Sequence, residues 1–583
     1  MTKHSVIALS TLMCTLLTGC KFGEPMKVTF AHVGDTHAHF EEQVVQIGLP
    51  DQNGKLTPTF AYAGGYPKLK TKVDQLRQKA STEGKGFLLL HSGDAFSGTL
   101  YFSVFKGQLD ADFMNYFQFD AMALGNHEFD LGNQVLADFS KTLDFPLLSA
   151  NTKVKRKDPL DGRYFSATYK MIGNQPIAIV GLTTEFTEII SNPSDATVFD
   201  NAIASAKKMV NDLSAVGVNK IVFLTHLGLE QDRLLAKSVP GIDVILGGHS
   251  HSLVGDFSNI GLPNYGPAPI IETDPAGHPV CIMHSGEFAK DIAVTDVQFT
   301  GDGLVSSCDG QTILIVGNVF ARGNPARPVD ASALQSITDF IKGAKNIEIV
   351  ANDPTAQSML DIAKSKVTEF SSSVIGYASE NLYHVRVPGD THPLGGVLAE
   401  GSLVAPHVAQ SMAFKMQQTT GRPHVALINA GGVRADLEGN VTVGDAYSVV
   451  PYASTLVSLT LTGASLSTAL SKNVSNAYKI SGVAFPYVAN LEYTINLADP
   501  TTPTIETIKV KDSNGIYQPL NPAAMYSVVT TSYLSSGGDL YTFPSATNKT
   551  DTGHVDAAVF SEYIQSLPGA TLTRIPSGIT IHR

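Results

Sequence analysis

Short runs of apolar residues recur along the first half of the chain, each bounded by glycine or by a polar residue. The six runs are KVTFAHV (27–33), GFLLLHS (86–92), FPLLSA (145–150), PIAIVGL (176–182), KIVFLTH (220–226) and IDVILGG (242–248). Their length and their β-branched residues are typical of strands buried on both faces. Segments such as 199–215, with apolar residues at helical spacing, lie between several runs. This alternation predicts an α/β domain in layers around a largely central sheet.

The pattern changes after the last of these runs. Residues 252–280 are rich in Gly and Pro, which predicts a loop. Residues 353–370 have the pattern of one helix that begins at Asp353 as N-cap with Pro354 at its first position, and we expect it to connect two domains. A second mixed unit follows. We therefore predict a first domain over 26–325, a linker helix over 353–370 and a second α/β domain over 371–583.

Composition excludes several classes of protein. The chain has 583 residues, 43% hydrophobic and 16% charged, which is typical of globular domains and too long for a single core. A formal net charge of −12 argues against a nucleic-acid polymer as partner, since that would demand a basic face. A small anionic substrate stays compatible, because bound metal ions reverse the local sign of charge.

The N-terminus has the pattern of an export signal. Lys3 precedes the apolar run VIALSTLMCTLL and then LTGC, the order of charged, apolar and small residues in a secretory signal. LTGC resembles the bacterial lipobox, so we predict a signal peptide over 1–19 and lipidation of Cys20, with a buried N-terminal helix as the alternative. Lys21 resembles the residue found in lipoproteins sorted to the outer membrane. The expected location is the periplasm or the outer membrane, with membrane contact only through the lipid anchor.

Two cysteines remain in the mature chain, Cys281 and Cys308. In an oxidising compartment they could form a disulfide, or they could be two buried free thiols. The sequence leaves both open.

Metal-ligand residue types follow five short apolar segments, four of the runs above and the segment that ends just before GNHEFD. They are Asp35 and His37, then Asp94, then Asn126 with His127, then His226, and finally His249 with His251. Ligands of open α/β sheets gather at the carboxyl ends of the strands. Carboxylate, imidazole and amide oxygen without thiolate suit Zn, Mn, Fe, Co or Ni. One carboxylate can bridge two ions about 3.5–4 Å apart that together activate water and stabilise an in-line displacement.

The blocks GDTHAH, GDAF, GNHEFD, THLG and GGHSHS resemble the five motifs of the calcineurin-like metallophosphoesterases, across 27–251. The resemblance implies a four-layer β-sandwich flanked by helices and a site for two divalent ions such as Zn, Mn, Co or Fe. It assigns the residues as follows: Asp35, His37, Asp94 and His251 to one ion; Asp94, Asn126, His226 and His249 to the other; His127 as the catalytic histidine; and Asp130 as the acid that orients it. His39 and His91 have no counterpart in the motifs and are expected to be supporting residues, and Glu128 a solvated or scaffold acid.

Two stretches of the second half, 427–463 and 531–543, resemble the substrate-binding domain of the bacterial and animal 5′-nucleotidases. The resemblance implies that Tyr452 and Tyr533 stack on the base, that Asp539 contacts the ribose, and that further contacts come from Asn429, Gly431, Gly432, Arg434 and Arg386. The chain departs from the family pattern in having Tyr where Phe is usual, PYAS where PFGN is usual, and only Arg386 where two arginines are usual. Core packing is the alternative for both tyrosines.

Together these features predict an enzyme that hydrolyses phosphate esters of nucleotides with metal-activated water, with a small-molecule substrate and no nucleic-acid polymer. Alternatives are a 2′,3′-cyclic phosphodiesterase with 3′-nucleotidase activity, a UDP-sugar or NAD pyrophosphatase, the sulfur-hydrolysing branch, and a surface nucleotide-binding lipoprotein that has lost catalysis. The preferred nucleotide, the metal and the oligomeric state are left open.

Overall fold

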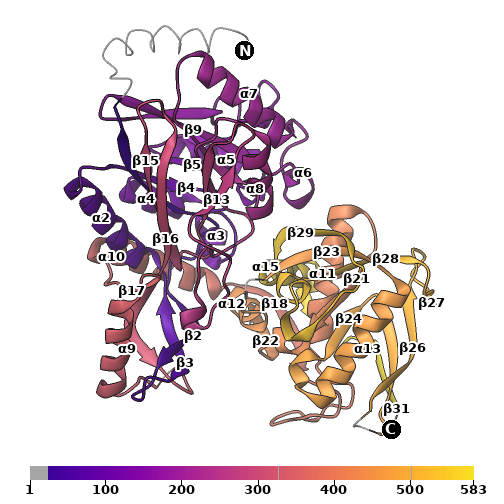
Figure 1. The fold of residues 1–583 in the computed structure, drawn as a ribbon. Coiled ribbons are helices and arrows are strands. Elements are labelled where there is room, and N and C mark those ends of the chain that lie inside the picture. Colours follow the sequence, from indigo (N-terminus) through magenta and orange to yellow (C-terminus); the bar gives the residue numbers. More distant parts are fainter. Residues whose placement is uncertain (1–23, 326, 453, 500–501, 583) are drawn as a thin grey trace. The chain divides into compact units, whose positions relative to one another are not determined.

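The computed structural model describes residues 24–325, 327–452, 454–499 and 502–582 (Figure 1). The predicted signal peptide over 1–19 and Cys20 lie outside the described residues. The chain divides into two compact units between Ser365 and Lys366. Within the described residues, no helix combines the length and the apolar character needed to cross a membrane.

The first unit contains a sheet in the strand order β2-β3-β16-β15-β1-β4-β5-β6, with β17 paired to β16. Strands β1, β4, β5 and β6 are parallel neighbours, so their carboxyl ends lie at one edge. The strands are β1 (Met26–Val33), β2 (Gln43–Pro50), β3 (Leu56–Ala63), β4 (Gly86–His91), β5 (Ala121–Ala123), β6 (Leu147–Leu148), β15 (Asp291–Phe299), β16 (Val305–Ala321) and β17 (Ile347–Ile349).

A second sheet of the first unit has the order β13-β14-β12-β11-β9-β8. Its strands are β8 (Ala167–Ile172), β9 (Gln175–Thr183), β11 (Ile221–His226), β12 (Val244–Gly247), β13 (Ile270–Thr273) and β14 (Pro279–His284). All six apolar runs noted in the sequence are strands of the two sheets. The predicted loop over 252–280 is wrong in part, because Ile270 and Ile271 pair antiparallel with β14. The many Gly and Pro residues around this short strand are typical of loops, so the sequence pattern did not predict it.

Helices cover the outer faces of both sheets. Helix α2 (Tyr66–Thr82) lies against β1, β4 and β16, whereas α7 (Ala202–Ala215) and α8 (Leu229–Ser238) lie against the second sheet. Other elements of this unit are α3 (Leu100–Phe105), α4 (Gln108–Phe117), α5 (Gly132–Thr142), α6 (Thr187–Ile190), β7 (Thr152–Val154) and β10 (Thr197–Phe199). Helix, sheet, sheet and helix make four layers, so the predicted four-layer sandwich is confirmed.

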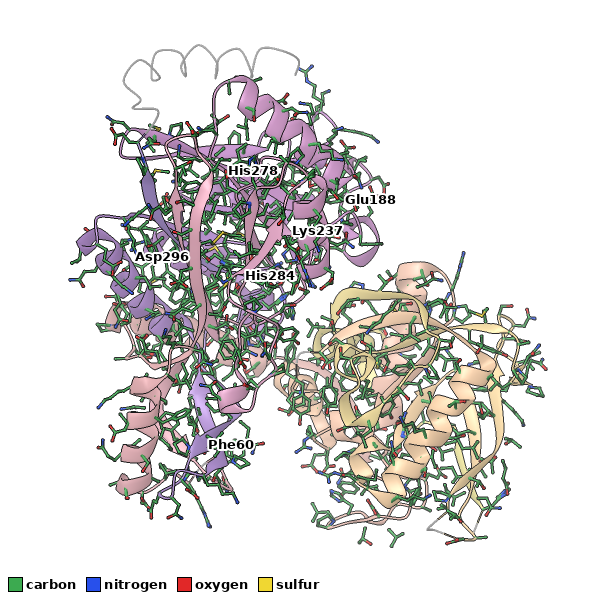
Figure 2. The ribbon with its side chains drawn as sticks, in the orientation of Figure 1. Phe60, Glu188, Lys237, His278, His284 and Asp296 are labelled. Atoms are coloured by element: carbon green, nitrogen blue, oxygen red, sulfur yellow. A yellow bond between two sulfur atoms is a disulfide. The ribbon has the colours of Figure 1, made fainter. Side chains whose placement is uncertain are left out.

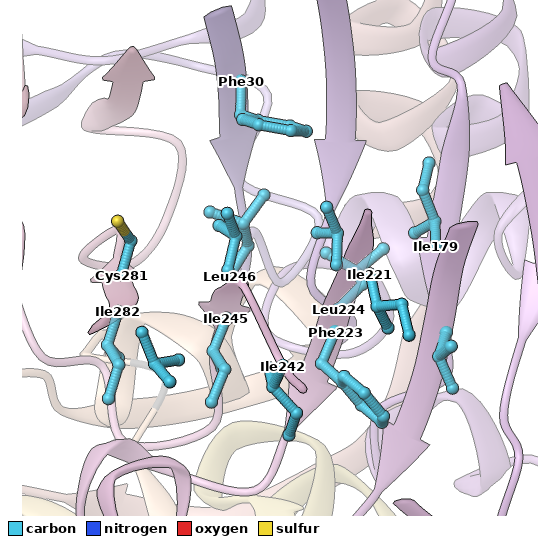
Figure 3. Close-up of a cluster of buried hydrophobic side chains, with 14 of the residues drawn as sticks. Phe30, Ile179, Ile221, Phe223, Leu224, Ile242, Ile245, Leu246, Cys281 and Ile282 are labelled. Carbon is cyan, nitrogen blue, oxygen red and sulfur yellow. The ribbon is translucent and has the colours of Figure 1, made fainter. Parts of the chain in front are cut away.

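The core of the first unit lies between the two sheets. Phe30 of β1 belongs to one buried cluster with Ile179, Phe223 and Ile245 of the second sheet (Figure 3). At about 25 cal/mol per Å² of buried apolar surface, this interior is the main source of stability. It gives the loops at the strand ends a rigid base.

A disulfide joins Cys281 of β14 to Cys308 of β16, with the Cα atoms 6.4 Å apart. The question that the sequence left open is thereby decided in favour of pairing. The bond links a strand of the second sheet to a strand of the first. The cysteines are 27 positions apart in sequence, and a closed loop of this length contributes about 3–4 kcal/mol by the chain-entropy relation.

Beyond residue 325 the first unit continues with α9 (Ala331–Gly343) and with β17, which pairs with β16. The predicted helix over 353–370 is α10 (Pro354–Ser371), and Oδ1 of Asp353 accepts the N–H of Ala356 at 2.7 Å, as expected of an N-cap. Helix α10 runs across the division between the two units.

The second unit is also α/β. Its main sheet has the order β24-β21-β28-β23-β29, and smaller sheets are β22-β18-β30, β27-β26-β25-β31 and the hairpin β19-β20. The strands are β18 (Val374–Leu382), β19 (Thr391–His392), β20 (Gly396–Val397), β21 (Val425–Asn429), β22 (Leu437–Thr442), β23 (Thr455–Thr462), β24 (Pro486–Ala489), β25 (Leu491–Asn496), β26 (Thr504–Lys511), β27 (Tyr517–Pro519), β28 (Met525–Thr531), β29 (Thr547–Val555), β30 (Thr571–Leu572) and β31 (Ile579–His582). The helices are α11 (Ala405–Thr420), α12 (Val443–Val449), α13 (Gly463–Lys479), α14 (Ser532–Ser535) and α15 (Asp556–Ser566).

Candidate metal centre

The seven predicted metal ligands lie at the carboxyl ends of strands from both sheets of the first unit. The ligand atoms of Asp35, His37 and His251 lie within 4.8 Å of one another, as do those of Asp94, His226 and His249. They come from β1, β4, β5, β11 and β12 or from the turns that follow these strands, and they are Asp35, His37, Asp94, Asn126, His226, His249 and His251.

Asp94 lies between the two groups. Its Oδ2 atom is 2.9 Å from Nε2 of His226 and 3.9 Å from Nε2 of His37. On the other side, Nε2 of His37 lies 3.3 Å from Nε2 of His251. One carboxylate thus faces imidazoles of both groups, which is the arrangement of a bridging ligand.

The backbone is left-handed at five of the seven ligands. Their φ angles are 51° at Asp35, 48° at His37, 57° at Asp94, 78° at His249 and 51° at His251. Residues other than glycine adopt this conformation at a cost, and such residues cluster at functional sites. The strand ends therefore turn sharply, and these turns bring the side chains together.

Close approach of the backbone explains the glycine of the GNHE block. A Cβ atom on Gly125 would lie 2.1 Å from Oδ1 of Asp94. A Cβ on Gly248 would likewise lie 2.8 Å from Oδ2 of Asp35. Any larger residue at these two positions would displace a predicted ligand.

Hydrogen bonds behind the ligands fix the imidazole rings. Nδ1 of His37 lies 3.0 Å from the carbonyl oxygen of Phe96, and Nδ1 of His226 lies 2.8 Å from that of Ser92. A carbonyl accepts only from a protonated nitrogen, so Nδ1 carries the hydrogen in both rings. In the neutral form of each ring, Nε2 then presents its lone pair toward the site, as metal ligation requires.

The charge states suit cation binding. Burial lowers the pKa of His37 to about 4 and of His249 to about 3, so both rings are neutral ligands at neutral pH. Burial alone would raise the pKa of Asp94, but the neighbouring imidazoles of His226 and His127 hold it well below its usual value. The centre therefore offers two carboxylates, Asp35 and Asp94, with neutral imidazoles at His37 and His249. Burial alone would lower the pKa of His226, but in the absence of an ion the Asp94 carboxylate raises it to about 9, and the Asp35 carboxylate likewise raises the pKa of His251.

One buried atom tests whether the residues fit a metal. Within the described part of the chain, Oδ1 of Asn126 is buried and has no hydrogen-bond partner. Buried polar atoms are almost always satisfied, so an atom of this kind indicates a group that occupies the space beside it. Carboxylate, imidazole and amide oxygen are donors that divalent transition metals accept, and the residues thus fit the predicted ions.

His127 pairs with Asp130. Its Nδ1 is 2.7 Å from Oδ2 of Asp130, whose carboxylate also accepts from the hydroxyls of Ser191, at 2.7 Å, and of Ser97. Nε2 of His127 lies 3.9 Å from Oδ2 of Asp94, so the second nitrogen of the ring is directed toward the centre. The sequence pointed to neither serine, since Ser97 follows the GDAF block without being part of it and Ser191 lies in a segment without a motif.

Glu128 is fully buried, so the expectation of a solvated acid is wrong and that of a scaffold acid is correct. Its carboxylate accepts the N–H groups of Asp94, Ala95 and Gly125 at 2.7–2.9 Å. Burial, together with the Asp94 charge, raises the pKa of Glu128 to about 7. The side chain holds the turns that carry Asp94 and Asn126.

The supporting histidines lie behind the ligands. His91 is buried, and its Nε2 lies 3.1 Å from the hydroxyl of Thr36. The ring of His39 lies 4.1 Å from that of Phe288, centroid to centroid. A further buried pair joins Oδ2 of Asp232 to Nε2 of His284 at 2.8 Å. His284, which is labelled in Figure 2, is the last residue of β14.

In the second unit, Asp539 connects several predicted substrate-binding residues. Its carboxylate accepts from Nδ2 of Asn429 at 2.5 Å and from the hydroxyl of Tyr533 at 3.0 Å. A Cβ on Gly431 would lie 3.2 Å from Oδ2 of Asp539, and one on Gly432 would lie 2.7 Å from Oδ1 of Asn429. Small residues are therefore required where these chain segments meet.

The two predicted stacking residues are open to solvent. Tyr452 is 57% exposed and Tyr533 is 51% exposed. Neither ring is part of a core, so the alternative of core packing does not describe them. Exposed aromatic faces are available to stack on a planar ligand.

Arg434 and Arg386 are both exposed, and both lie within electrostatic reach of His384. Burial is the main cause that lowers the pKa of His384 to about 4, and the two arginine charges add to it. Asp436, which the sequence did not single out, accepts the N–H of His384 at 2.6 Å and lies 3.0 Å from Nε2 of His392. It thereby ties the segment that carries Arg386 to the loop that carries Arg434.

Comparisons with known proteins agree with this geometry. Residues 28–253 match the family model described as calcineurin-like phosphoesterase, and residues 395–546 match the 5′-nucleotidase C-terminal domain. The chain is 30% identical over 554 residues to a probable 5′-nucleotidase of Treponema pallidum, an alignment that covers 92% of this chain and 91% of that protein.

Solved structures are similar over nearly the whole length. The NAD nucleotidase of Haemophilus influenzae has a TM-score of 0.82 and 27% identity, covering 96% of this chain and 99% of that one. A 5′-nucleotidase precursor of Thermus thermophilus has a TM-score of 0.57 and 31% identity, covering 95% and 99%.

Proposed function

This chain belongs to the 5′-nucleotidase family of metal-dependent hydrolases, and we propose which of its residues carry out the hydrolysis of nucleotide phosphate esters. In this proposal Asp35, His37, Asp94 and His251 hold one divalent ion. Asp94 with Asn126, His226 and His249 holds a second ion. The observation that carries the proposal is the position of Asp94 between both groups of ligands, beside an unpartnered buried oxygen of Asn126.

Divalent ions bound there supply Lewis-acid stabilisation of the phosphoryl group and make water a better nucleophile at neutral pH. The protein's own contribution is the placement of His127. Because Asp130 accepts from Nδ1, the proton that His127 can give to a leaving oxygen is held at Nε2. Ser97 and Ser191 fix the carboxylate of Asp130, and this limits rotation of the imidazole.

We further propose that the second unit binds the nucleoside part of the substrate. Tyr452 and Tyr533 supply faces for the base, and Asp539 supplies acceptors for ribose hydroxyls. The exposure of both rings and the contacts that Asp539 makes to Asn429 and Tyr533 support this assignment. Arg434 and Arg386 supply planar donors for an anionic or carbonyl group.

Tyr452→Ala and Tyr533→Ala are expected to raise the Michaelis constant for AMP with little change in turnover at saturation. Base stacking contributes about 1–3 kcal/mol per ring, which corresponds to roughly 5- to 150-fold. Turnover changes little because a stacked base is bound equally in the ground and transition states. The measurement is steady-state phosphate release from AMP.

A small aryl phosphate, which has no base to stack, is the control substrate for both variants. Equal losses on AMP and on the aryl phosphate would show that the tyrosines act through the fold instead. No loss on AMP would show that the rings do not bind the base.

We also propose that the protein is exported and anchored by lipid on Cys20. The residues LTGC support this, and so does the Cys281–Cys308 disulfide, because such bonds persist in oxidising compartments. Metabolic labelling with a radioactive fatty acid is expected to label the wild type and not Cys20→Ser. Equal labelling of the two proteins would rule out this anchor.

A further inference from the structure

The segment that follows β14, residues 285–290, lies against the ligands of one proposed metal position; we call it the β14 strap. The N–H of Phe288 donates to the carbonyl of Asp35 at 2.8 Å. The carbonyl of Phe288 accepts a hydrogen bond from Nε2 of Gln43 at 2.9 Å. The aromatic ring of Phe288 contacts the imidazole of His39. These contacts fix the strap beside the turn that follows β1.

Within the strap, Glu287 contacts a predicted ligand directly. Its Oε2 lies 2.7 Å from Nδ1 of His251, and its Oε1 lies 3.0 Å from Nζ of Lys290. On the opposite side of the same ring, Nε2 of His251 lies 3.4 Å from Oδ1 of Asp35 and 3.3 Å from Nε2 of His37. The carboxylate therefore holds the ring with Nε2 toward the other ligands.

We propose that Glu287 is a positioning residue for the metal position of Asp35, His37, Asp94 and His251, and that this position depends on it while the other does not. This inference rests on the metal ligands assigned under the proposed function. Glu287 would determine how tightly one of the two ions is bound without being a ligand of that ion itself.

The difference between the two positions follows from burial and from the type of acceptor. The side chain of His251 is 36% exposed, so packing alone does not hold it. His226 of the other position has a fully buried side chain, and its Nδ1 donates to a neutral carbonyl. A carboxylate acceptor bonds more strongly than a carbonyl and makes the imidazole a better donor to a cation. Removal of Glu287 should thus free His251 and leave His226 in place.

The test is Co²⁺ binding to the full-length metal-free protein, followed by calorimetry and by the visible spectrum of the bound ion. In Glu287→Ala, one of two binding steps is expected to weaken about 10- to 100-fold, the range typical for partners of metal-bound histidines, while the other keeps its affinity. Dialysis should then leave one Co²⁺ per chain where the wild type keeps two. Glu287→Gln, which keeps an acceptor oxygen without charge, should give an intermediate loss.

Glu348→Gln is the matched control, since Glu348 also pairs with a lysine, Lys72, and belongs to β17 and not to the strap. It should bind two ions as the wild type does. Unchanged affinities in Glu287→Ala would overturn the inference, and so would an equal loss at both steps. A lower unfolding temperature of metal-free Glu287→Ala, with no difference between Ala and Gln in Co²⁺ binding, would assign Glu287 to the fold. Wild-type protein that bound no Co²⁺ would contradict the proposed metal centre itself.

Discussion

Removal of divalent ions from the protein is expected to lower the rate of nucleotide hydrolysis about 10⁴-fold or more. The ions would supply several kcal/mol of charge stabilisation and also activate water, and each 1.36 kcal/mol is a factor of ten in rate. Among the described residues, the groups of possible ligands at the strand ends consist of Asp and His side chains, and none of these carries the charge of a divalent ion. Phosphate release from AMP after exhaustive chelation measures the loss.

Restoration by Mn²⁺, Zn²⁺ or Co²⁺, added singly, identifies which ions support turnover. Asp94→Ala serves as the matched variant, because a carboxylate that faces both groups of ligands should be required for both ions. Full activity of the metal-free protein would contradict the proposed mechanism. Full activity of Asp94→Ala would show that Asp94 does not bridge.

His127→Ala is expected to slow turnover about 10²- to 10⁴-fold, the usual contribution of general acid–base catalysis, and to leave the metal content unchanged. The reason is the pair with Asp130 and the direction of Nε2 toward the centre. Steady-state turnover and metal analysis of the same preparation are the two measurements.

The leaving group provides a control on the role of His127. An aryl phosphate whose leaving group is a weak base needs little protonation, so its hydrolysis should suffer less from His127→Ala than that of AMP. Equal losses on both substrates would assign His127 to charge stabilisation instead of proton donation. Loss of an ion in His127→Ala would show that His127 is a metal ligand. The metal content is measured because the ring nitrogen of His127 lies within 4.8 Å of the ligand atoms of His37 and Asp94.

The proposed ligands could be selected from the sequence because each follows closely on a strand. Asp35, Asp94 and His226 lie at or within three residues of the ends of apolar runs, and parallel strands present those ends at one edge. The strands were predictable for the same reason, but the pattern predicted one largely central sheet, and the sandwich of two sheets was implied only by the family resemblance. Short strand β13 was not predictable, because its flanking residues are typical of loops.

The residues that position Asp130 and His251 could not be predicted. Ser191 lies 61 residues from Asp130 in sequence, and Glu287 lies 36 residues after His251, both in segments without regular structure or a motif. Their contacts depend on how loops from different strands meet, and neither periodicity nor spacing contains that information. The pairing of Cys281 with Cys308 could not be decided from the sequence for a related reason, because the bond joins strands of two different sheets.

The five left-handed residues at the strand ends have a consequence for any attempt to transplant this centre. At about 1 kcal/mol each, their strain is of the order of 5 kcal/mol, which approaches the net stability of a typical domain. Loops grafted onto another scaffold would relax to ordinary backbone conformations, because residues other than glycine disfavour the left-handed conformation. The side chains of the proposed ligands would then no longer come together. In this protein the buried sheets beneath the turns support them. The carboxylate of Glu128 also accepts hydrogen bonds from the backbone N–H groups of Asp94 and Gly125. A designer would therefore have to carry over the sandwich interior together with the ligand loops.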